Sequence, residues 1–286
     1  MSTRTSTRMW SLAAHAALIP LAIFTLIPFF WLLTASLKST DDFFSSMFLP
    51  LDADTGAVAW DHLTFDNYRR LFFELGVGRA LLNSIFLSSA TAVLATLCCA
   101  AGGYALARLR FGGRNLVTIL VLAALIIPPP LLLAPTYQLL YELGLLDTYT
   151  GLILPALAPA FGVFLFRQAT IQSVPKDILE AARIDGCSEI GIFFGVVLPL
   201  VRPMVGAFML ITFLATWNNF VWPQVVIQTG DKFPLSVAIA QLKGVYRQDY
   251  GLIMAGTVVS VLPPAALFLI LQKEFISGLT AGAVKG

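Results

Sequence analysis

The sequence predicts an all-α membrane protein with six transmembrane helices, arranged as a single domain over residues 1–286. Hydrophobic residues make up 58% of the chain and charged residues only 12%, whereas soluble domains carry roughly 25% charged residues. Six blocks lack Asp, Glu, Lys and Arg, and about 20 such residues form a helix that crosses the ~30 Å bilayer core. Because the blocks are continuous rather than alternating, they favour helices over a membrane β-barrel. The blocks cover about 12–36, 80–107, 115–135, 151–166, 203–227 and 251–271.

The first apolar block follows Arg4 and Arg8, a pattern that also introduces secretory signal peptides. A signal peptide has an apolar core of about 7–15 residues that ends at a small-residue cleavage site. Here the uncharged run continues from Ser11 to Leu37 without a convincing cleavage site. We therefore expect this block to remain as the first membrane helix.

Charge and cysteine content argue against several other classes of protein. The net charge of +2 is too small to indicate binding to nucleic acid. Cys98, Cys99 and Cys187 provide neither a disulfide framework nor the paired spacing of a zinc site. We expect no nucleic-acid partner and no metal.

The distribution of lysine and arginine predicts the orientation of the helices. With the N-terminus inside, the inner segments hold 11 of the 18 cationic residues, and the short segment 108–114 alone has three arginines. Positive residues near the ends of membrane spans favour the cytoplasm. Both termini are therefore expected to be cytoplasmic, with one large inner loop at 167–202. The outer segments would be 37–79, 136–150 and 228–250.

The chain lacks an energy source and a catalytic centre of its own. It has no G-x-x-x-x-G-K-[ST] loop to hold nucleotide phosphates, and no H-E-x-x-H or G-x-S-x-G motif. No carboxylate or lysine lies inside a predicted span, although ion-coupled carriers usually need one there. We therefore expect a transport protein that is not an enzyme and that docks a separate motor. An ion-coupled secondary carrier or channel, and a membrane-embedded enzyme, are the alternatives.

Residues 175–186 of the inner loop favour a short surface helix. Pro175 suits the first helical turn, and the acidic residues that follow lie near the positive end of the helix dipole. Gly186 can adopt the left-handed conformation that ends a helix. Glu180 would then be available to a partner, although on local physics a pair with Arg183 on the next turn is equally reasonable.

A second short helix is predicted to start near Ser188 and to stop before Pro199. The alternative, a membrane span over 190–214, would place Arg202 near its middle. That arrangement costs about 2.5–3.5 kcal/mol or more, so we reject it.

The inner loop resembles the EAA loop of binding-protein-dependent ABC importer permeases. The match consists of Glu180-Ala181-Ala182, Gly186 and Val196-x-Leu198-Pro199 with the family's spacing, and valine replaces the usual isoleucine at 196. Other strings, spread over most of the chain, resemble the carbohydrate branch, the maltose-type inner subunit. These strings are Phe65-Asp66-Asn67-Tyr68, Asn83-Ser84, Gly103-Tyr104-Ala105, Trp217-Asn218-Asn219 and residues 278–286.

The resemblance implies a type I ABC importer permease bundle whose cytoplasmic coupling helix sits in a cleft of an ATPase subunit. In that cleft, Glu180 would bind a basic group and the two alanines after it would pack closely. The resemblance further implies that Thr280 to Gly286 reach the ATPase interface and that the outer segment 231–250 meets the external binding protein. The expected ATPase-coupling residues are Glu180, Ala181, Ala182, Gly186, Leu198 and Pro199.

The resemblance also implies the partners and the cargo. The partners are a second homologous permease, two ATPase subunits and an external solute-binding protein, in the inner (plasma) membrane of a prokaryote. ATP and Mg belong to the ATPase, so this chain needs no cofactor. The cargo is expected to be a sugar, with glycerol phosphate or a polyol as the alternative.

Trp217, Asn218 and Asn219 are candidates for the solute pathway, because they lie about 21 Å along the helix that begins near residue 203. Asparagine amides there could bond a sugar hydroxyl, and they could equally bond neighbouring helices. Asn83 and Gln138 are similar candidates. The resemblance implies that the partner permease supplies most of the sugar contacts.

Overall fold

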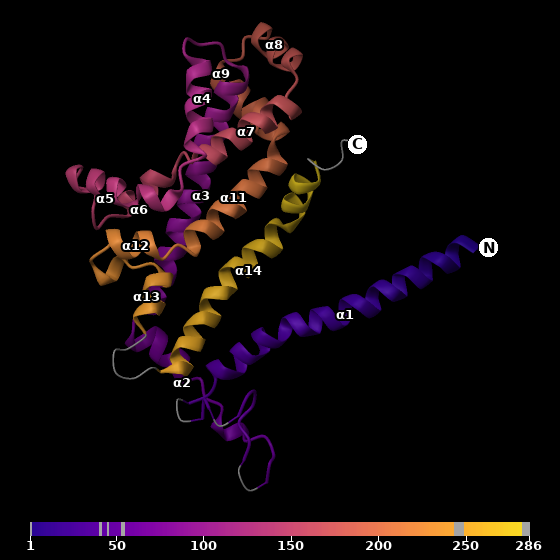
Figure 1. Ribbon diagram of the computed structural model, residues 1–286, viewed down its shortest axis with the longest axis vertical. Coiled ribbons are helices and arrows are strands. Elements are labelled where there is room, and N and C mark those ends of the chain that lie inside the picture. The colour runs from indigo at the N-terminus through magenta and orange to yellow at the C-terminus, as the bar shows by residue number, and fades with distance from the viewer. Residues whose placement is uncertain (1, 40–41, 45, 53–54, 243–248, 282–286) are drawn as a thin grey trace. The chain divides into compact units, whose positions relative to one another are not determined.

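The computed structural model describes residues 2–39, 42–44, 46–52, 55–242 and 249–281 (Figure 1). Within these ranges the regular structure is helical, apart from two isolated β-bridges, Lys38–Leu63 and Leu51–Val58. The all-α prediction is confirmed. The chain forms two compact units: residues 1–78 with 239–261, and residues 79–238 with 262–286. The prediction that residues 1–286 form a single domain stays a prediction.

Three helices of the described chain are by themselves long and apolar enough to cross a membrane. They are α1 (Ser2–Ser36), α3 (Val77–Arg108) and α14 (Tyr250–Ala281). Three further candidates are helix pairs that bend by more than 40° at a short break, which gives up to six spans within the described residues. The remaining elements are η1 (Trp60–His62), α2 (Asp66–Arg69), η2 (Arg70–Glu74), α4 (Arg114–Ala124), η3 (Pro129–Leu132), α5 (Leu133–Glu142), α6 (Tyr149–Ile153), η4 (Leu154–Ala156), α7 (Ala160–Ser173), α8 (Lys176–Ile184), α9 (Glu189–Ile192), η5 (Phe193–Val197), α10 (Leu198–Leu200), α11 (Arg202–Trp217), α12 (Val221–Val226), η6 (Gly230–Lys232) and α13 (Leu235–Gln241).

The third predicted span, 115–135, is broken rather than continuous. Helix α4 ends at Ala124, and the chain resumes at Pro129 in a direction that differs by 105°. Three consecutive prolines explain the break, because proline cannot donate a backbone hydrogen bond and pushes the residue before it out of the helical conformation. Pro128 is accordingly extended, with ψ of 127°.

The fourth and fifth predicted spans also have different bounds. The predicted span 151–166 consists of helical segments before and after Pro159, bent by 45°, and α7 continues to Ser173. The predicted span 203–227 is helical only as far as Trp217, and α12 is a separate short helix. The bent pair that contains this span also includes Glu189–Leu200 of the predicted inner loop, and the two halves differ in direction by 84°. Each break coincides with a proline or with polar residues whose side chains bond the local backbone.

In the first unit, the side chain of Asn67 holds the end of α1 and the residues directly after it in place by hydrogen bonds. Its buried Nδ2 donates hydrogen bonds to the carbonyl oxygens of Ser36, at 2.9 Å, and Lys38, at 2.8 Å. Gly251 lies so close that a Cβ atom would stand 2.7 Å from both Asn67 Nδ2 and the Lys38 carbonyl. Only glycine fits this approach between α14 and the loop.

In the second unit, α3 carries two core clusters along its length. Figure 1 shows α7, α8 and α9 near one end of α3, and α5, α6 and α12 beside a different part of it. Gly103 allows the backbones of α3 and α7 to meet, since a Cβ atom there would lie 2.6 Å from the Arg167 nitrogen and from Phe166 Cβ. The second unit therefore holds the inner loop rigidly against α3.

Candidate functional site

Helix α8 is anchored by one buried side chain and has Glu180 on its exposed surface. Leu179 is 1% exposed and packs in the core cluster with Tyr104 and Ile192, whereas Glu180 and Ala181 are exposed. No ion pair of Glu180 occurs among the residues that the structure describes. The carboxylate of Glu180, which the sequence analysis predicts to be a coupling group, therefore lies on an anchored helix and is accessible to a partner.

Gly186 ends α8 in the left-handed conformation that the sequence predicts, with φ of +81°. The amide of Gly186 donates to the Arg183 carbonyl at 3.1 Å, and the amide of Cys187 donates to the Ala182 carbonyl at 3.0 Å. This pair of bonds is a Schellman motif, which satisfies carbonyls at a helix C-terminus. It fixes the direction in which the chain leaves α8.

The second helix of the loop begins as predicted but ends later. Ser188 caps it, because Ser188 Oγ accepts a hydrogen bond from the Gly191 amide at 3.1 Å. The helix then continues through the π-helical turn η5 into α10, which contains Pro199, so the predicted stop before Pro199 is wrong. The π turn changes the hydrogen-bond register and places Pro199 in a first helical turn, where its missing N–H is tolerated.

Glu189 joins the two helices of the loop to α3. Its carboxylate accepts hydrogen bonds from Arg183 Nε at 2.6 Å and from the Tyr104 hydroxyl at 2.5 Å. Arg183 therefore pairs with Glu189, and not with Glu180 as local spacing alone allowed. The bond from Arg183, followed by the bond from Tyr104, lowers the pKa of Glu189 below its usual value. We call these three residues the clasp.

Arg108, at the end of α3, fixes the entry to the loop. Its guanidinium donates to the carbonyls of Thr170, Ile171 and Val174, at the C-terminal end of α7. A cation at this position also suits the negative end of the helix dipole. The inner loop is thus held at its entry by Arg108 and in its middle by the clasp.

A polar cavity of about 640 Å³ lies between the end of α3 and α8. Glu180 lines it, together with more cationic than acidic side chains. The cationic side chains are Arg108, Arg110, Arg114, Lys176 and Arg183.

All five candidate pathway residues have their side chains engaged within the protein, and Asn219 Oδ1 accepts a hydrogen bond from the Trp222 amide at 3.3 Å. Trp217 is 5% exposed and stacks on Phe213, with ring centroids 5.6 Å apart. The amide nitrogen of Asn218 donates to the Leu214 carbonyl of its own helix, at 2.9 Å. Gln138 is exposed and donates to the carboxylate of Glu142 at 3.1 Å.

Asn83 fixes the loop that contains Asp231 and Phe233 rather than facing a cavity. Its Nδ2 donates to the carbonyls of Asp231 and Phe233, at 2.9 and 3.1 Å, and its Oδ1 accepts from the Tyr149 hydroxyl at 2.9 Å. Of the five candidates, Asn219 alone lines the apolar cavity described next. The structure therefore does not bring the five candidates together.

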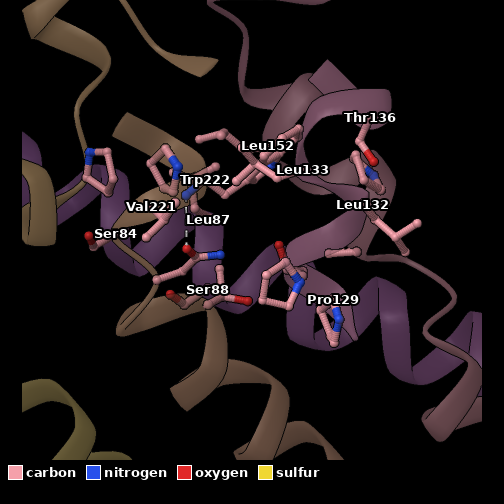
Figure 2. A pocket seen from close by; sticks show the side chains of 18 residues that line it. Ser84, Leu87, Ser88, Pro129, Leu132, Leu133, Thr136, Leu152, Val221 and Trp222 are labelled. Atoms are coloured by element: carbon pink, nitrogen blue, oxygen red, sulfur yellow. Dashed lines mark hydrogen bonds between the residues drawn. The ribbon is translucent and has the colours of Figure 1, made fainter. Parts of the chain in front are cut away.

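The second unit contains an apolar cavity of about 460 Å³ beside α3, shown in Figure 2. The proline break after α4 lines one side, and α12 with the ring of Trp222 lines another. None of the described residues that line it is ionisable. Its polar side chains are Ser84, Ser88, Thr91, Thr136, Thr216 and Asn219.

Sequence reasoning missed five of these six polar residues. Ser84, Ser88 and Thr91 are spaced at i, i+4 and i+7, which places them on one face of a helix. That spacing was the available signal. The cavity also depends on the direction of the chain after the proline break, which no local pattern specifies.

The statistical profile of one protein family matches residues 99–279, well over half of the chain. The family is described as the inner membrane component of binding-protein-dependent transport systems. This chain belongs to that family. The matched residues include the whole of the inner loop.

Full-length relatives agree with this assignment. An arabinooligosaccharide transport permease of Halalkalibacterium halodurans is 40% identical over 97% of this chain and 96% of its own length. A diacetylchitobiose uptake permease of Streptomyces coelicolor is 34% identical over 98% of this chain and 91% of its own length. A lactose transport permease of Rhizobium radiobacter is 29% identical over 100% of both chains.

A solved structure agrees with the fold. It is a bacterial ABC transporter involved in the import of alginate, with a TM-score of 0.77 over 94% of this chain and 98% of that chain, at 23% identity. The permease therefore has the type I ABC importer fold predicted from its sequence. It is a multi-pass inner-membrane component of an importer that works with a solute-binding protein and an ATPase.

Proposed function

We propose that this permease forms half of the translocation pathway of an ATP-driven sugar importer, with both termini in the cytoplasm. The single observation that carries the proposal is the geometry of α8, which holds Glu180 outward on a helix anchored by Leu179 and ended by Gly186. A partner cleft can grip such a helix without unfolding it. The cation-rich segment 108–114 beside it supports a cytoplasmic location.

The coupling step follows from this rigidity. Glu180 binds a basic group in the ATPase cleft, while Ala181 and Ala182 allow close approach, and Leu198 and Pro199 continue the loop into α11. When the two ATPase subunits close on ATP, the clefts move, and the clasp passes that motion to α3. The bundle then rotates as a rigid body between its two access states. No covalent chemistry on this chain is needed.

The relatives and the apolar cavity support a neutral sugar as the cargo. Relatives at 34–40% identity carry arabinooligosaccharides and diacetylchitobiose by name. The described lining of the cavity offers hydroxyl and amide groups and no cation. A phosphate group would need a positive partner there, which disfavours glycerol phosphate. A polyol fits the same lining.

The remaining partners are a second homologous permease, two ATPase subunits that hold ATP and Mg, and an external binding protein. The segment proposed to meet that binding protein, 231–250, is anchored at its start by Arg79, which pairs with Asp231 at 2.8 Å. Its Lys243 and Arg247 lie outside the described residues, as do Gly282 to Gly286 of the tail proposed for the ATPase interface.

The proposal is tested by uptake into vesicles that contain this permease with its partner permease and ATPase. We expect labelled arabinotriose, delivered by the binding protein, to accumulate only with ATP on the ATPase side. Ionophores that dissipate ion gradients should leave uptake unchanged. Uptake that needs an ion gradient and not ATP would instead support a secondary carrier.

The clasp predicts a pH dependence of the inner loop. The pKa of Glu189 is lowered in the folded state. The ionised carboxylate therefore stabilises the inner loop fully above the ordinary carboxyl pKa of about 4.3, and this stabilisation is lost as the pH falls through the lowered pKa of the folded protein. A spin label on Cys187, in a Cys98→Ala background, should keep its mobility as the pH falls from 7 to the ordinary carboxyl pKa, and become more mobile only as the pH falls further, through the lowered pKa of Glu189. Glu189→Gln should show high mobility at every pH. A label on the unsubstituted protein that becomes mobile well above the ordinary carboxyl pKa, or one as mobile at pH 7 as in Glu189→Gln, would contradict the clasp.

A further inference from the structure

Three serine and threonine side chains on α3, those of Ser88, Thr91 and Thr96, have buried hydroxyls without a hydrogen-bond partner among the described residues. Ser88 and Thr91 are each 1% exposed. Helical hydroxyls normally donate to a carbonyl three or four residues earlier, as Thr118 and Thr257 do here. An unpaired buried hydroxyl destabilises a fold, and a bound polar group would remove that cost.

Ser88 and Thr91 lie on the wall of the apolar cavity. They are three positions apart, so they share one face of α3, and Figure 2 shows Ser88 among the residues of this wall. From other sides, α5 contributes Thr136 and α11 contributes Thr216. Neither of these threonine hydroxyls has a hydrogen bond within the described part of the chain, and both residues are partly exposed. Four hydroxyls without protein partners therefore surround one space.

We propose that these four hydroxyls form a solute subsite in this subunit that takes one or two units of a neutral, polyhydroxylated solute as it crosses the membrane. The inference rests on the proposed import function and adds that this permease, and not only its partner, contacts the cargo. The cavity volume of about 460 Å³ falls in the range of ~300–1,000 Å³ that small-molecule sites occupy. The absence of ionisable side chains from its described lining selects against charged solutes.

The hydroxyls divide into two classes. Those of Thr136 and Thr216 are accessible in this conformation. Those of Ser88 and Thr91 are shielded, and rotation about χ1 to another staggered well makes them available when a solute enters. The ring of Trp222 adds an apolar surface for the face of a sugar ring. The bound solute then supplies the hydrogen-bond partners that the hydroxyls of Ser88 and Thr91 lack within the described protein.

The test uses Thr91→Val, which replaces the hydroxyl with a methyl group of similar shape. Thr96→Val is the matched control, because Thr96 is on the same helix, is 2% exposed, has an unpaired hydroxyl and lies outside this cavity. Both variants should raise the thermal unfolding midpoint, since each removes an unpaired buried polar group. Only Thr91→Val should impair transport.

The readout is the number of arabinotriose molecules imported per ATP hydrolysed, in vesicles with the full transporter and saturating binding protein. A neutral hydrogen bond changes binding by roughly two- to tenfold. We therefore expect Thr91→Val to lower the ratio by that factor while ATP hydrolysis continues at its original rate. Thr216→Val should have a similar effect, and Thr96→Val none.

An unchanged ratio in both Thr91→Val and Thr216→Val would overturn the subsite. So would an equal loss in Thr96→Val, or a loss of transport in Thr91→Val accompanied by a lower unfolding midpoint, because either points to a structural role. Failure of the original transporter to import arabinotriose or any other neutral sugar with ATP is a different result, and it refutes the proposed function itself.

Discussion

Glu180→Lys is expected to abolish ATP-driven uptake while the permease still inserts and folds. Glu180 is exposed and has no ion pair in the described chain, so reversing its charge removes no contact within the permease. In the ATPase cleft, however, the new lysine would face the basic group that we propose Glu180 binds. Breaking a close charged pair at an interface costs about 2–5 kcal/mol or more, which weakens ATPase binding by ~30-fold to several thousand-fold.

Two measurements check this result: copurification of the ATPase with the permease, and uptake in vesicles. Glu142→Lys is the control, because it makes the same charge change at an exposed residue on α5, remote from α8 in the sequence. It should retain the ATPase and near-normal uptake. Full copurification and uptake by Glu180→Lys would show that α8 does not carry the coupling contact.

Gly103→Ala is expected to reduce the amount of folded permease strongly, and far more than Gly102→Ala at the neighbouring position of α3. The new Cβ atom would lie 2.6 Å from the backbone nitrogen of Arg167. Overpacking usually costs about 1–3 kcal/mol, and backbone atoms cannot rotate away as a flexible side chain can. We therefore expect a cost of about 3 kcal/mol or more, and separation of α3 from α7.

The neighbouring glycine supplies a matched comparison. A Cβ atom at Gly102 would lie 3.5 Å from Val163 Cγ1, an ordinary contact. Gly102→Ala should be tolerated, and it gains about 0.8–1.0 kcal/mol of helix propensity. Detergent-solubilised yield and the thermal unfolding midpoint distinguish the two variants. Equal midpoints for Gly102→Ala and Gly103→Ala would contradict the close approach of α3 and α7.

Local chemistry predicted much of the inner loop from the sequence. The conformational freedom of Gly186 and the capping oxygen of Ser188 act within a few residues, and both residues occupy the positions predicted. Pro175 was expected in the first helical turn and is instead the extended residue just before α8. The pairing of Glu189 with Arg183 and Tyr104 was not predicted, because it depends on α3 lying beside the loop.

The broken spans and the apolar cavity were harder to predict. Apolar composition shows that residues 115–135 can lie in a membrane, but it does not give the 105° change of direction after Ala124. The cavity forms where that bend meets α3 and α12. Trp217 and Asn218 were chosen as pathway candidates because their side-chain types are often found at sugar sites. The serines and threonines that line the cavity are common in membrane helices, so their type alone did not indicate a site.

The central claim, that α8 and its turn face the cytoplasm and dock an ATPase, can be measured at Cys187. This cysteine is exposed, follows Gly186 directly and is present in the natural sequence. In a Cys98→Ala background, a membrane-impermeant maleimide should label it in inside-out vesicles and not in right-side-out vesicles. Adding the ATPase subunits should protect it. Labelling from the outside, or labelling that the ATPase does not alter, would contradict the account.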